Sequence, residues 1–80
     1  MPRLKVLSGE EIVKILKSFG FEIVAQKGSH IKMRREKSGL KQTLTIPNHK
    51  EIDRGTLKAI YNQSVRYISE IELRSYFYTD

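Results

Sequence analysis

Apolar residues recur along the chain at two spacings, and these spacings separate expected helices from expected strands. In the first part of the chain they follow the period of a helix, at Ile12, Val13, Ile15, Leu16 and Phe19. Ser8 and Glu11 stand three residues apart, as in a capping box, and Gly20 is a typical C-terminal stop. The pattern therefore predicts a first helix that starts at Ser8 and ends before Gly20.

The following segment favours three strands, over residues 21–26, 30–36 and 41–46, joined by turns at 27–29 and 37–39. Successive side chains of a strand point to opposite faces. On the first strand, Phe21, Ile23 and Ala25 are expected on one side. On the other two strands the apolar set is expected to point inward, at Ile31, Met33, Leu44 and Ile46. The opposite face then carries His30, Lys32, Arg34, Thr43 and Thr45.

A second helix is predicted to start near Asp53, a good N-cap, and to end at Gln63 or Ser64. Its buried face is expected at Leu57, Ile60 and Tyr61. Ser69 and Glu72 have the spacing of another capping box, which favours a short third helix or helical tail over residues 70–76.

This order predicts a single α+β domain over residues 1–80, with a helix, a three-stranded antiparallel sheet, a second helix and a helical tail. Both long helices are expected on one face of the sheet, which leaves the other face open. The chain has no cysteine, which excludes a disulfide framework and fits a cytoplasmic protein. The sequence also predicts no signal peptide and no membrane span.

Charge adds a functional indication. Fifteen Lys and Arg residues against nine Asp and Glu give a formal net charge of +6. The excess is concentrated between residues 27 and 41, where only Glu36 opposes Lys27, Lys32, Arg34, Arg35, Lys37 and Lys41. This distribution favours binding to a nucleic acid or to an acidic protein.

The tripeptide Gly28-Ser29-His30 places a histidine at a tight turn that opens a basic strand. Histidine is the side chain best suited to proton transfer near neutral pH. Its neighbours offer no set of metal ligands and no glycine-rich phosphate loop, so the chemistry that fits needs neither a metal nor another cofactor. RNA is a substrate that fits this chemistry, because the ribose 2′-OH is itself a nucleophile.

Two other features remain open. The predicted second helix could bind a phosphate at its N-terminus, flanked by Arg54 and Lys58, or could begin with an ordinary first turn. His49 is interpreted as a loop histidine that packs against the sheet or hydrogen-bonds the backbone, rather than as a catalytic residue.

Five segments, in this order, resemble the HicA-type mRNA interferase toxins of bacterial and archaeal toxin–antitoxin pairs. They are Leu7-Ser8-Gly9-Glu10-Glu11, Leu16-Lys17-Ser18-Phe19-Gly20-Phe21, Lys27-Gly28-Ser29-His30, Ile46-Pro47-Asn48-His49 and Arg54-Gly55-Thr56-Leu57-Lys58-Ala59-Ile60. The resemblance implies a double-stranded-RNA-binding-domain-like fold, cleavage of mRNA, neutralisation by a HicB-type antitoxin, and a catalytic histidine at His30.

The combined hypothesis is a metal-independent RNA endonuclease toxin with His30 as general acid or base. Lys32 and Arg34 are expected to bind the RNA backbone and to stabilise the phosphorane. The remaining RNA-binding residues are expected at Lys27, Gly28, Ser29, Arg35, Lys41, Arg54 and Lys58.

Two alternatives remain, a non-catalytic RNA-binding module with the same basic face and a protein-binding adaptor that uses the aromatic tail. That tail contains Tyr67, Tyr76, Phe77 and Tyr78, and is interpreted either as extra core or as an antitoxin interface.

Overall fold

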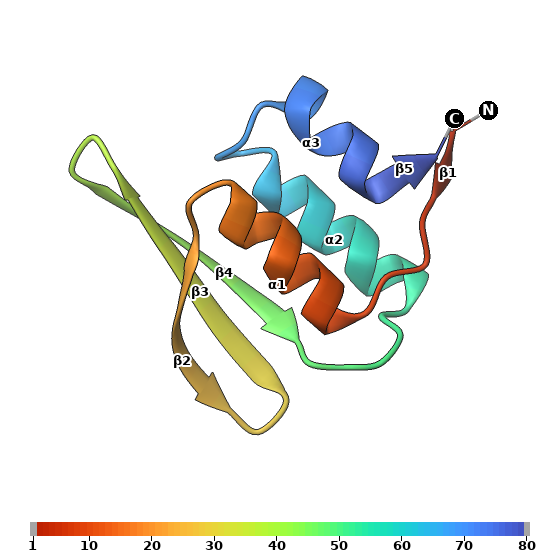
Figure 1. Ribbon diagram of the computed structural model, residues 1–80, viewed down its shortest axis with the longest axis horizontal. Coiled ribbons are helices and arrows are strands. Elements are labelled where there is room, and N and C mark those ends of the chain that lie inside the picture. The colour runs from red at the N-terminus through yellow and green to blue at the C-terminus, as the bar shows by residue number, and fades with distance from the viewer. Residues whose placement is uncertain (1, 80) are drawn as a thin grey trace.

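A three-stranded sheet and a layer of helices form the protein in a computed structural model that describes residues 2–79 (Figure 1). The elements follow in the order β1 (Arg3–Leu4), α1 (Gly9–Ser18), β2 (Glu22–Lys27), β3 (His30–Lys37), β4 (Leu40–Pro47), α2 (Arg54–Ser64), α3 (Glu70–Phe77) and β5 (Tyr78–Thr79). The predicted α+β order of helix, three strands, helix and helical tail is confirmed.

Both long helices begin at the predicted caps. The Ser8 hydroxyl accepts a hydrogen bond from the Glu11 N–H at 3.0 Å, and the Ser8 N–H donates to the Glu11 carboxylate at 2.9 Å. The bond from the Ser8 N–H is the main reason why the pKa of Glu11 lies below its usual value. The Asp53 carboxylate accepts from the Thr56 N–H at 3.0 Å and starts α2 in the same way.

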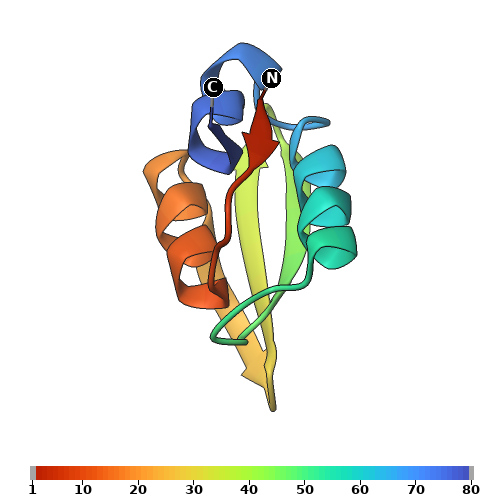
Figure 2. The same ribbon diagram turned by 90° about the vertical axis from the view of Figure 1, so that its right-hand side faces the viewer.

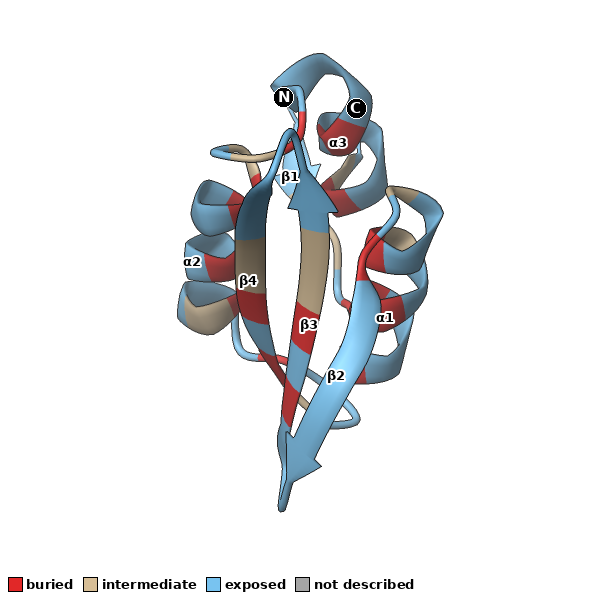
Figure 3. Ribbon diagram, turned by 90° about the vertical axis from the view of Figure 1, so that its left-hand side faces the viewer, coloured by how far each residue is buried: buried red, intermediate tan, exposed pale blue. Residues whose placement is uncertain are grey.

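The sheet is antiparallel in the order β2-β3-β4, and α1 and α2 cover one of its faces. Figure 3 shows the uncovered face, with both helices behind the strands. The inward side chains of β3 and β4 form the sheet's share of the core, at Ile31, Met33, Leu44 and Ile46. The predicted alternation of β3 and β4 and the open face are confirmed.

Strand β2 departs from simple alternation. Ile23 pairs with Met33, but the next paired residue is Ala25, which lies opposite Lys32. Val24 is therefore the extra residue of a β-bulge, and the side chains after it change face. Ala25 lies on the open face with Lys32, so the prediction that it shares a side with Phe21 and Ile23 was wrong.

The C-terminal segment extends the core. Phe77 is fully buried and packs against Tyr61, with ring centroids 5.3 Å apart. Of the two interpretations of the aromatic tail, extra core fits Phe77, whereas Tyr76 keeps 41% of its surface exposed. The capping box predicted for α3 was wrong, because the Ser69 side chain makes no cap hydrogen bond.

Two short strands, β1 and β5, join the ends of the chain and were not predicted from the sequence. Arg3 pairs with Thr79 and Leu4 with Tyr78, in a separate antiparallel sheet. Figure 2 shows this N-terminal strand in front of the helix layer, with both termini close together. The Lys5 N–H also donates to the Phe77 carbonyl at 2.7 Å, so the N-terminal segment and α3 are held to each other.

Candidate nucleic-acid interface

The turn between β2 and β3 places His30 at the start of a strand. Lys27 pairs with His30, and Gly28 has a φ of 58°, a conformation that glycine adopts without strain. The Asn48 N–H donates to the Ser29 carbonyl at 2.5 Å, which ties the turn to the segment after β4. The His30 side chain is exposed on the open face, as predicted.

Strand pairing arranges the open face in rows that cross the sheet, because paired residues of neighbouring strands point to the same side. One row contains Lys27, His30 and Pro47. The next contains Ala25, Lys32 and Thr45, and the third contains Glu22, Arg34 and Thr43. Alternate residues of a strand are about 7 Å apart, so β3 presents His30, Lys32 and Arg34 at regular intervals along one line.

A shallow hollow lies where the first two rows meet. It has a volume of about 250 Å³ and is lined by Ala25, Lys27, His30, Lys32 and Thr45. All five residues are exposed. The structure thus brings together three predicted site residues, His30, Lys27 and Lys32, around one opening. Ala25 and Thr45 were not predicted as site residues. The alternation of β4 indicated the face of Thr45, but no local signal indicated the bulge that turns Ala25.

Arg34 lies farther along the same face and is half-buried. Its Nε atom is shielded from solvent and has no hydrogen-bond partner among the residues that the structure describes. Buried donors of this kind are usually satisfied, so this atom is an exception in the fold, and Arg34 adds to the open face through the charge of its guanidinium.

Arg35 does not belong to this face. Its side chain lies under the helices, where Nη1 donates to the Phe19 carbonyl at 2.8 Å and Nη2 to the Tyr67 carbonyl at 2.6 Å. Nε donates to the Gln42 side chain at 2.8 Å, and the guanidinium lies 4.9 Å from the centroid of the Phe21 ring. The structure contradicts the expected place of Arg35 beside the RNA, because these contacts use its hydrogen-bonding atoms inside the fold. The alternation of β3 could have indicated this, since Arg35 has the parity of Ile31 and Met33.

The remaining predicted cations are dispersed. Lys41 is exposed at the far end of the open face, opposite Glu36. Arg54 and Lys58 are exposed on α2 and so belong to the layer on the other side of the sheet. At the N-terminus of α2 the Asp53 carboxylate already accepts the Thr56 N–H. Hydrogen bonding to Thr56, first through its side chain and then through its backbone, lowers the pKa of Asp53. An ordinary first turn therefore describes this terminus better than a phosphate site.

His49 contributes through its backbone. Its carbonyl accepts a hydrogen bond from the Gly9 N–H at 2.8 Å, whereas its side chain is exposed. The side-chain packing proposed from the sequence was wrong, and the backbone hydrogen bond takes its place. Gly9 is required there, because a Cβ atom on it would lie 2.1 Å from the Pro47 carbonyl oxygen.

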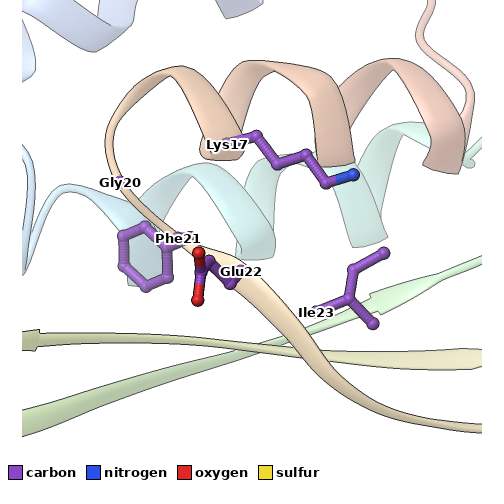
Figure 4. A pocket seen from close by; sticks show the side chains of 5 residues that line it. All are labelled: Lys17, Gly20, Phe21, Glu22 and Ile23. Carbon is purple, nitrogen blue, oxygen red and sulfur yellow. The ribbon is translucent and has the colours of Figure 1, made fainter.

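A larger hollow lies away from His30, between the end of α1 and β2 (Figure 4). It is lined by Lys17, Gly20, Phe21, Glu22 and Ile23, which offer one cation, one carboxylate and no histidine. The charges of Lys17 and Glu22 are opposite, so this hollow does not favour a polyanion as the open face does.

Between residues 2 and 79, no helix is long and apolar enough to cross a membrane. Over the same range, no three His, Asp or Glu side chains cluster in a way that could hold a metal ion.

Comparison with known proteins tests the resemblance noted in the sequence. Curated proteins and solved structures give no significant match. A family model does match, that of the HicA toxin of bacterial toxin–antitoxin systems, over residues 9–64. The matched range contains α1, the whole three-stranded sheet and α2, together with the turn that carries His30. Since this is well over half of the chain, the protein belongs to the HicA toxin family.

Proposed function

We propose that this toxin is a metal-independent RNA endonuclease that cleaves mRNA on the open face of its sheet, with His30 as general acid or base. The family is known for toxins that cleave mRNA. The observation that supports the proposal in this chain is the hollow in which an exposed His30 stands beside Lys27 and Lys32. It combines a proton-transfer group with cations at the place where a phosphodiester can approach.

The reaction needs no external nucleophile. The 2′-oxygen of the RNA attacks the adjacent phosphorus and loses its proton, the bond from phosphorus to the 5′-oxygen breaks, and that oxygen gains a proton. The products are a 2′,3′-cyclic phosphate and a free 5′-hydroxyl. His30 takes the first proton or supplies the second, and general acid–base help of this kind contributes about 10²- to 10⁴-fold in rate.

Cations around the histidine complete the site. The ammonium groups of Lys27 and Lys32 stabilise the negative charge that develops on the phosphorane oxygens. Arg34 and Lys41 lie on the same face, beyond this centre, and bind more distant phosphates. Because cleavage requires the 2′-OH, DNA of the same sequence is bound without being cut.

The deciding experiment compares wild type and His30→Ala on a long RNA in EDTA, with thermal melting of both. His30→Ala is expected to lose cleavage and to keep both its melting temperature and its RNA affinity, because the residue is exposed. His49→Ala is the matched control, since it removes the other histidine from an exposed position. Near-wild-type cleavage by His30→Ala would reject the catalytic assignment in favour of a non-catalytic RNA-binding module.

Family membership implies an antitoxin partner. We further propose that a HicB-type antitoxin covers the His30 face and places acidic or hydroxyl groups against Lys32 and Arg34, in the cytoplasm where mRNA is found. An inhibitor gains most where it both occupies the site and neutralises its cations. Hydrogen exchange should then slow along β3 in the complex, whereas protection confined to the helices would contradict this arrangement.

A further inference from the structure

We propose that the hollow beside His30 is a subsite for one unpaired nucleobase, with Ala25 as its floor and Thr45 at its side. The inference rests on the proposed function in one respect, that the polyanion on this face is RNA. It goes beyond that function by stating which part of the RNA the hollow binds, namely a base, whereas the basic residues alone indicate only contact with phosphates.

The bulge at Val24 creates the space. Ile23 pairs with Met33, so an unbroken ladder would place Val24 opposite Lys32 and turn Ala25 toward the helices. The bulge instead places Ala25 opposite Lys32. The methyl group of Ala25 therefore occupies the position on the open face that the larger Val24 side chain would otherwise fill. Bulges often turn a side chain in this way next to functional sites.

The lining suits a base better than it suits a further phosphate. Ala25 and the methyl group of Thr45 offer apolar surface, and the Thr45 hydroxyl can donate or accept a hydrogen bond at the edge of a base. Lys27 and Lys32 stand at the rim, where an ammonium can interact with an aromatic ring or with the phosphate attached to the same nucleotide.

A base-binding hollow next to His30 favours single-stranded RNA as the substrate. A base that enters the hollow must leave its stack, and bases that are splayed out of single strands do so readily. A base in the hollow also holds its own ribose close to His30, so that this contact orients the 2′-OH for attack. The hollow and His30 together would therefore recognise a base and position the RNA for cleavage.

The test uses an uncleavable probe, a short single-stranded RNA with 2′-O-methyl groups, and versions of it that lack the base at one position at a time. Ala25→Leu fills the hollow from β2. Gln26→Leu adds a similar side chain on the other side of the same strand, since Gln26 pairs with Ile31, and is the matched control. Thr45→Leu fills the hollow from β4 and provides a second variant should Ala25→Leu melt early.

For wild type and Gln26→Leu, removal of one particular base should raise Kd about tenfold, the size of a single base–protein contact. Ala25→Leu and Thr45→Leu should bind the intact RNA about tenfold more weakly and lose their sensitivity to that missing base. If both filled variants bind the intact RNA as tightly as wild type, or if no single base matters to wild type, the subsite is rejected.

The two proposals fail separately. The binding measurements need no turnover, so a wild-type protein that does not cleave RNA overturns the catalytic assignment and leaves the base subsite to be judged by Kd. Conversely, a protein that cleaves RNA and whose Ala25→Leu and Thr45→Leu variants bind normally keeps the function and loses the subsite.

Discussion

Arg35→Ala should destabilise the protein strongly, although Arg35 stands in the most basic stretch of the sequence. Its guanidinium donates to two backbone carbonyls, those of Phe19 and Tyr67, and to the side chain of Gln42. These acceptors belong to the end of α1, to the segment after α2 and to β4. The substitution therefore removes one side chain that holds three separate parts of the fold together.

The expected cost follows from these bonds. A hydrogen bond to a charged group contributes about 1.5–3 kcal/mol net, but three bonds of one side chain are not additive, and water can reach part of this half-buried site. We therefore expect a loss of about 3 kcal/mol, where small domains have a total stability of about 5–15 kcal/mol. At about 4–8 °C for each kcal/mol, the melting temperature should fall by roughly 12–24 °C.

Thermal melting and RNA titration of three variants test this reasoning. Arg35→Lys keeps the charge but cannot reach three acceptors, so it should regain less than half of the lost stability. Arg34→Ala removes the adjacent arginine from the open face, and should weaken RNA binding with little change in melting temperature. The reasoning is refuted if Arg35→Ala melts like wild type and loses more RNA affinity than Arg34→Ala.

Three further outcomes are expected. RNA affinity should fall with salt at a slope of log Kobs against log [salt] near −3, if about four phosphates of a single strand are contacted, and a slope of zero would reject the basic face. His49→Ala should melt within a few degrees of wild type, because alanine keeps the carbonyl that binds the Gly9 N–H; a large drop would show that the imidazole itself is structural. Burial, with a hydrogen bond donated to Glu70, raises the pKa of Tyr61 above 10.0, so the stability that Tyr61 contributes should be present below pH 10 and lost as pH rises through the folded pKa. Urea denaturation of Tyr61→Phe should lack this alkaline loss, and an equal loss in the variant would contradict the assignment.

Local signals in the sequence were sufficient for most of the fold. The caps at Ser8 and Asp53 depend on residues three positions away, and the hairpin turns depend on glycine at positive φ, so both could be predicted from short stretches. Alternation then placed His30 and Lys32 on the open face. These features share one property, since each is decided by neighbours within a few residues.

Features decided by distant neighbours were missed. The pairing of Arg3 with Thr79 joins residues at opposite ends of the chain, and two-residue strands leave no periodic pattern. The bulge at Val24 depends on how β2 leaves α1 and joins β3, and valine is a common residue in regular strands. The place of Arg35 was mispredicted because its charge was given more weight than its position in the alternation of β3, although acceptors from three parts of the fold bind its guanidinium.

The placement of His30 depends on backbone contacts more than on side chains. The Ser29 carbonyl is bound by the Asn48 N–H, and the next residue, His49, accepts from the Gly9 N–H at the start of α1. Glycine at position 9 lets the start of α1 approach the segment after β4, because a Cβ atom there would clash with the Pro47 carbonyl oxygen. Hydrogen bonds between main-chain atoms therefore hold the turn, and the side chains at its rim take no part in them. Lys27, His30 and Lys32 are exposed at this rim, where the proposed function requires them.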